Sequence, residues 1–167
     1  MSSPNRLAWT AAACLCFCLT LCAQTPLTPS ALEGAWKLRS LSMDGKKTSA
    51  TGYMLFHGNY YSFITNMERP KLTAEISRKP GRELTEAEKD MHIETFRSMT
   101  ASAGSYSIEG DQIVYHQEVT RLPHLVGSRE GRKSWFEGDR LLQDFVGGGR
   151  RRVMEWERVS GGSAPKK

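Results

Sequence analysis

Two runs of alternating apolar and polar residues flank a turn signal at Glu109-Gly110-Asp111. One run covers residues 102–108 and the other covers residues 112–119. Because successive side chains of a strand point to opposite faces, this alternation predicts two antiparallel strands, each with one dry and one solvated face. The dry faces must be buried against further strands, so the pattern favours a β-sandwich or an up-and-down β-barrel.

Further short runs with the composition of strands cover most of the remaining chain. They comprise residues 32–41, 52–57, 59–66, 127–136, 140–145 and 151–159. Turn signals separate many of them, namely Asp44-Gly45, Gly58-Asn59, Gly138-Asp139 and Gly147-Gly148-Gly149. Together with the two runs above, they predict a mainly β fold of eight short antiparallel strands.

A single helix is predicted to interrupt these strands. Thr85 and Glu88 have the spacing of a capping box, which predicts a helix from Glu86 to about Thr100. The residues before it, 67–82, contain proline, glycine and many basic side chains, so we expect a long loop there. The helix would lie between strands 3 and 4 and could close the mouth of a barrel.

The N-terminal residues 1–23 have the three parts of a secretory signal peptide. Arg6 supplies a positive charge, residues 7–21 are free of charge and largely apolar, and Ala23 is a small residue at the predicted cleavage position. We therefore expect cleavage after Ala23 and a secreted or periplasmic protein without a stable membrane span. Two alternatives remain: an uncleaved anchor, and a lipobox ending at Cys22 that would lipidate the protein and attach it to the envelope.

The predicted cleavage after Ala23 also sets the domain organisation. Residues 24–31 are expected to form a polar linker, residues 32–159 a single β-barrel domain, and residues 160–167 a disordered tail. All four cysteines lie in the predicted signal peptide, so the folded domain would have no disulfide and no thiolate. Such a domain must be stabilised by its hydrophobic core alone.

Charge and histidine spacing argue against several functions. Lys and Arg outnumber Asp and Glu by 23 to 18, a mild excess that does not indicate nucleic-acid binding. The arginines at 150–152 follow three glycines, but no helix follows them, so a charged hairpin is favoured over a phosphate site. The four histidines have no metal-ligand spacing, and we predict neither a metal nor a cofactor.

An ordered series of motifs resembles a known family. It comprises Gly34-Ala35-Trp36, Gly52-Tyr53, Gly104-Ser105-Tyr106, residues 114–118, Pro123, Val126-Gly127, Arg132, residues 138–141 and residues 156–159. The series is similar to the bacterial and fungal lipocalin-like domain family over nearly the whole span from Leu32 to Val159. The resemblance implies an eight-stranded antiparallel barrel with an internal cavity. It also implies that Trp36 packs beneath an arginine of the last strand, for which Arg158 is the candidate, in a structural role.

The candidate cavity residues lie on neighbouring predicted strands. Adjacent residues of a strand face opposite sides, and the resemblance favours His116 and Glu118 as the pair that points inward. These two side chains and Arg132 could form a buried polar network, anchor a ligand, or act as an acid–base pair. We predict the following lining residues: Tyr53, Phe63, Tyr106, His116, Glu118, Arg132 and Trp135.

The expected function is that of a monomeric protein that binds a small hydrophobic or amphipathic molecule inside the barrel. No catalytic motif is present in the sequence. Two alternatives remain open: an isomerase or cyclase that uses His116 and Glu118 inside the barrel, and a structural envelope protein whose barrel is sealed by its own side chains.

Overall fold

The computed structural model of this chain describes residues 25–67 and 83–159. Nine strands and a few short or isolated helical segments make up this part. The strands are β1 (Gly34–Met43), β2 (Lys46–Thr48), β3 (Ala50–His57), β4 (Tyr60–Met67), β5 (Met99–Glu109), β6 (Gln112–Thr120), β7 (Arg129–Glu137), β8 (Arg140–Gly147) and β9 (Arg150–Arg158). The helical segments are α1 (Pro29–Leu32), α3 (Glu86–Ser98) and the 3₁₀ turn η1 (Pro123–Leu125).

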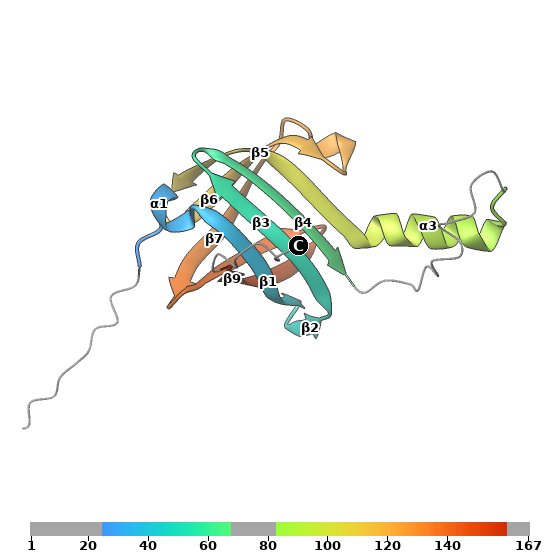
Figure 1. The fold of residues 1–167 in the computed structure, drawn as a ribbon, viewed down its shortest axis with the longest axis horizontal. Helices are drawn as coiled ribbons and strands as arrows, with labels where there is room; N and C mark the ends of the chain where they lie inside the picture. The colour runs from blue at the N-terminus through green and yellow to red at the C-terminus, as the bar shows by residue number, and fades with distance from the viewer. Residues whose placement is uncertain (1–24, 68–82, 160–167) are drawn as a thin grey trace, which may run out of the picture.

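Eight of the strands close into an antiparallel barrel, as predicted (Figure 1). The order is β1-β3-β4-β5-β6-β7-β8-β9, and β9 pairs back onto β1, with Trp36 opposite Arg158. The pairing of β5 with β6 is irregular at Gly104, where a Cβ atom would lie only 2.0 Å from the carbonyl oxygen of His116. Only glycine fits this close approach, which belongs to a β-bulge of the kind that bends strands around a barrel.

The predicted strand count missed one short strand. β2 pairs with the end of β1 and precedes β3, so the barrel carries one extra strand directly after the predicted turn at Asp44-Gly45. The helix therefore follows β4 and lies between β4 and β5, and its predicted position between strands 3 and 4 is corrected accordingly.

Helix α3 begins where the sequence predicted. The Thr85 side chain accepts a hydrogen bond from the backbone N–H of Glu88, and the Glu88 carboxylate accepts one from the Thr85 backbone. In Figure 1, α3 extends away from the barrel wall, and none of its residues is buried. Among the described residues, no helix is both long enough and apolar enough to span a bilayer.

The half of the barrel near α1 is filled by large side chains. Trp36, Phe56, Tyr115 and Trp156 are almost completely buried there, and Trp36 and Phe136 pack with ring centroids 6.1 Å apart. Burial of this apolar surface stabilises the barrel. Because these side chains occupy the interior, we expect an internal site to lie toward the other end.

The chain segment before β1 closes the filled end, although residues 24–31 were predicted to be a linker. Thr28 caps α1 through the backbone N–H of Ala31, and Leu32 is completely buried in the core. Proline suits the first turn of a helix, so Pro29 begins α1 instead of marking an irregular segment. The carbonyl oxygen of Leu32 accepts a hydrogen bond from the Trp36 indole at 2.7 Å.

Arg158 connects the last strand to α1, as the resemblance implied. Its guanidinium lies 4.2 Å from the Trp36 ring centroid and donates to the carbonyl oxygens of Ala31 and Glu33. We expect Arg158→Ala to lower the free energy of unfolding by about 1 kcal/mol, because an exposed cation–π contact and the hydrogen bonds to α1 are lost.

Chemical denaturation of the two proteins measures this difference. Arg129→Ala, on the outer face, is the matched control, since Arg129 makes an exposed ion pair with Glu109. We expect a smaller change for that control. Equal losses in the two variants would show that Arg158 does not fasten α1.

Several predictions fall on residues that the structure does not describe. These are the signal peptide of residues 1–23 with its alternative lipid anchor at Cys22, the disordered tail of residues 160–167, and the loop of residues 67–82 except Met67, which is the last residue of β4. They stay predictions.

Candidate ligand-binding site

A cavity of about 200 Å³ occupies the end of the barrel near α3. Its residues come from β4, β5, β6, β7, β8 and β9, from the end of α3 and from η1. Apolar side chains form part of the wall, namely Phe63, Met67, Leu122, Leu125, Phe145 and Met154. The cavity therefore lies inside the barrel, beyond the filled half, and combines apolar surface with the polar groups described below.

Arg132 borders the cavity on the side of the filled core. The inward residues of β7 run from Phe136 through Ser134 to Arg132 and Glu130, and only the last two line the cavity. Arg132 is 3 % exposed. Its guanidinium carbon lies 4.2 Å from the Phe145 ring centroid. The corresponding distances to the rings of Phe63 and Tyr115 are both 4.8 Å.

Glu130 orients this buried cation. One carboxylate oxygen of Glu130 accepts from Nε of Arg132 at 2.9 Å, and the other accepts from the Gln117 amide at 3.1 Å. A chain of hydrogen bonds continues through Ser102 to the hydroxyl of Tyr61. Burial raises the pKa of that tyrosine, so it stays neutral near pH 7. The network fixes Arg132 but leaves its Nη1 without a protein acceptor in the described part of the chain.

Two further arginines line the cavity with incomplete hydrogen bonding. Nε of Arg121 and Nε of Arg152 are buried and, like Nη1 of Arg132, find no acceptor among residues 25–67 and 83–159. Burial and the neighbouring charge of Arg132 lower the pKa of Arg152. Burial of an N–H group without a hydrogen-bond partner lowers the stability of the folded protein. Three such groups around one cavity therefore make it a site for a hydrogen-bond acceptor.

A buried polar cluster lies in the core next to Arg132. The Gln143 amide donates to the Tyr115 hydroxyl at 2.6 Å, and its oxygen accepts from the Trp156 indole at 3.2 Å. Burial raises the pKa of Tyr115 to about 12, so its hydroxyl is neutral. Gln143, Tyr115 and Trp156 thus form hydrogen bonds with one another, and none of the three lines the cavity.

The structure brings two of the predicted lining residues into this cavity, Phe63 and Arg132. Tyr106 also points inward, but it lies in the filled core, where its ring packs against Phe56 and its hydroxyl donates to the carbonyl oxygen of Gly58. It does not line the cavity.

His116 and Glu118 lie on the outer face of the barrel, so their predicted inward orientation is wrong. Glu118 is exposed and accepts from Ser105, and His116 lies near the Ser107 hydroxyl. The alternate residues of β6 face inward, because burial of Ile113 and Tyr115 stabilises the barrel more than burial of a histidine and a carboxylate would. An acid–base pair of His116 and Glu118 inside the barrel is therefore not formed.

Trp135 is also on the outer side, since its neighbours Ser134 and Phe136 face inward. Its indole donates to the Glu137 carboxylate at 3.1 Å. Strand alternation placed Trp135 and Arg132 on opposite faces, so the two could not both line one interior cavity.

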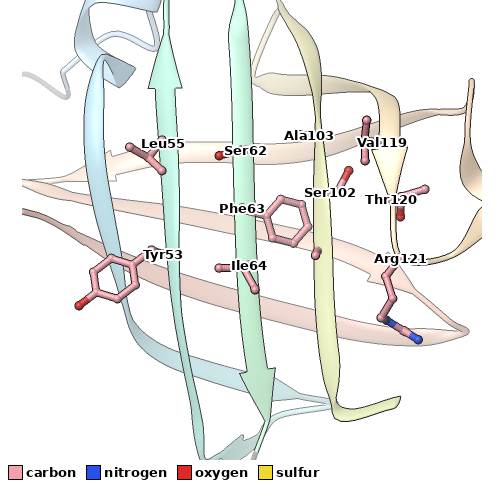
Figure 2. A pocket seen from close by; sticks show the side chains of 11 residues that line it. Tyr53, Leu55, Ser62, Phe63, Ile64, Ser102, Ala103, Val119, Thr120 and Arg121 are labelled. Carbon is pink, nitrogen blue, oxygen red and sulfur yellow. The ribbon is translucent and has the colours of Figure 1, made fainter. Parts of the chain in front are cut away.

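A second hollow lies on the outside of the barrel wall (Figure 2). Tyr53, which was predicted to line the interior, belongs to this outer groove and is 51 % exposed. The groove has a volume of about 280 Å³ and crosses strands β3 to β6. Tyr53 and Leu55 on β3 and Ile64 on β4 project from the strands around it in Figure 2. It differs from the interior cavity in having little charge, since Arg121 is the one charged residue among the described residues that line it.

In the part of the chain that the structure describes, no group of three or more His, Cys, Asp or Glu side chains could hold a metal ion. The chemistry of the interior cavity is that of arginine donors and apolar surface. Such a site can bind and orient a molecule.

Comparison with known proteins gives a family match that agrees with this architecture. A model of the lipocalin-like domain family matches residues 33–147. Among solved structures, the crystal structure of a mutant of the fluorescent protein UnaG is similar, with a TM-score of 0.38 and 14% sequence identity, over 80% of this chain and 100% of that one. A search of curated proteins found no match.

Proposed function

The chain belongs to the lipocalin-like domain family, and on that premise we propose that its barrel binds a small amphipathic molecule in the cavity near α3. The observation that carries this proposal is the composition of that cavity. Apolar walls from Phe63, Phe145 and Met154 enclose a buried arginine, Arg132, that retains an unused donor. Binding sites for small molecules typically combine apolar surface with a few such polar groups.

The size of the cavity limits the ligand. A volume of about 200 Å³ is below the roughly 300–1,000 Å³ of sites that enclose drug-sized molecules. The ligand is therefore small, or part of it extends past the rim formed by Leu122 and Leu125. We further propose that the protein is exported and acts as a monomer, as its N-terminal sequence and its single barrel suggest.

Native mass spectrometry of the protein purified from its own host, followed by organic extraction, tests this function. We expect a stoichiometric small molecule in the wild type. Thr65 and Ile64 are adjacent on β4, and they line the interior cavity and the outer groove, respectively. Thr65→Phe should fill the interior and lose the molecule, whereas Ile64→Phe should retain it.

Thermal unfolding followed by circular dichroism shows whether both variants fold. If Thr65→Phe does not fold, Leu122→Trp at the rim replaces it. Loss of the molecule in Ile64→Phe with retention in the interior variants would place the ligand in the outer groove instead. A wild-type protein that is empty and binds neither octanoate nor 1-octanol would contradict the proposal.

A further inference from the structure

We propose that the cavity recognises an oxyanion, such as a carboxylate, that is held jointly by Arg132 and Arg152 on either side of Phe145. The inference rests on the proposed function and adds the chemical class of the ligand to it. The bound molecule would place its anionic group against the two guanidinium groups and its apolar part toward the rim of the cavity.

The register of three strands brings these two arginines together. β7 pairs with β8 so that Lys133 is opposite Asp144, which makes Arg132 and Phe145 neighbours at one level of the barrel. β8 pairs with β9 so that Phe145 is opposite Arg152. Arg132 and Arg152 therefore lie at the same level, with Phe145 between them.

The donors of both arginines are only partly used. Arg132 donates through Nε to Glu130, and its Nη1 has no acceptor among the described residues. Nε of Arg152 is buried and has no acceptor in the same part of the chain. Guanidinium groups bind oxyanions through pairs of N–H donors, so an oxyanion between them would satisfy donors that the protein leaves open.

The positive charge of the cavity also favours an anionic ligand. Three lining arginines, Arg121, Arg132 and Arg152, each have a buried N–H group without an acceptor, against one lining carboxylate, Glu130, among the described residues. A fourth lining arginine, Arg97, is exposed and pairs with Glu94. The depressed pKa of Arg152 agrees with burial of one cation beside another. An anionic ligand would relieve this repulsion in a partly desolvated site, where charge interactions are stronger than in water. A neutral ligand would leave it unchanged.

Adjacent arginines of β9 provide a matched test. Arg152→Gln removes a charge that lines the cavity, and Arg151→Gln removes the same charge from the outer face, where Arg151 pairs with Asp144. Isothermal titration of both variants and the wild type uses octanoate, octyl phosphate and the neutral 1-octanol as probes. We expect Arg152→Gln to weaken the binding of the anionic probes by about 10-fold or more. Binding of 1-octanol should change less than about 2-fold, and Arg151→Gln should leave all three affinities near those of the wild type.

The outcomes separate this inference from the proposed function. A preference for octanoate or for octyl phosphate that disappears in Arg152→Gln supports the oxyanion site, and the tighter probe identifies the class of acid. Equal binding of 1-octanol and the anions, unchanged in Arg152→Gln, would overturn the oxyanion site and leave the ligand-binding function standing. Failure of every probe to bind the wild type would overturn both. Arg152→Met, which removes the same charge from the same position with an apolar side chain, replaces Arg152→Gln if that variant does not fold.

Discussion

Replacement of Trp36 by alanine is expected to lower the free energy of unfolding by about 3–5 kcal/mol, the usual cost of deleting a large buried aromatic side chain. Trp36 is completely buried, donates to Leu32, packs against Phe136 and lies beneath Arg158. Its loss would leave a cavity at the filled end and detach α1 from the barrel. Urea denaturation followed by fluorescence of the remaining tryptophans measures the change.

Trp135→Ala is the control for this prediction. Trp135 is half-buried on the outer face and is bonded to Glu137, so we expect a loss of about 1 kcal/mol. Comparable losses in the two variants would show that the packed end of the barrel does not dominate its stability. If Trp36→Ala does not fold at all, Trp36→Phe should fold with an intermediate loss.

Gln143→Ala is the second substitution with a large expected effect, a loss of about 2–4 kcal/mol of unfolding free energy. Gln143 is completely buried and joins the hydroxyl of Tyr115 to the indole of Trp156. Its removal would leave both groups without that partner, and each unsatisfied buried polar group costs about 1–3 kcal/mol. Thermal and urea unfolding check this expectation.

The outer residue Gln112 provides the comparison, because it is exposed at the start of β6. Gln112→Ala should change stability by about 0.5 kcal/mol or less. A Gln143→Ala protein as stable as wild type would mean that Tyr115 and Trp156 find other partners. The polar cluster would then not hold the core next to Arg132 in place.

Alternation and turn signals predicted most of the barrel. Every predicted strand has a counterpart, and the capping box at Thr85 located the start of α3. The errors have local causes. β2 is only three residues long and follows a turn, so it has too few residues to show a period. The predicted linker of residues 24–31 contains most of α1. Thr28 and Pro29 are a suitable N-cap and first residue for that helix, but the helix is only four residues long and shows no hydrophobic period.

The site was harder to predict than the fold. His116 and Glu118 were chosen from the family resemblance. Residues 113, 114 and 115 are all apolar, so the hydrophobic pattern alone did not decide which face of β6 points inward. Arg152 was missed because the run Arg150-Arg151-Arg152 resembles a solvated charge cluster. Counting back by two from the buried residues of β9, Trp156 and Met154, would have placed Arg152 inside. Cavity volume depends on side-chain packing, which no periodicity reveals.

The most direct test of ligand binding inside the barrel is an NMR titration that follows the arginine Nε–H signals as octanoate is added. We predict that the signals of Arg132 and Arg152 shift and saturate together, while that of Arg151 on the outer face stays unchanged. Shifts confined to residues of the outer groove, such as Tyr53 and Ile64, with the Arg132 and Arg152 signals constant, would contradict an interior site.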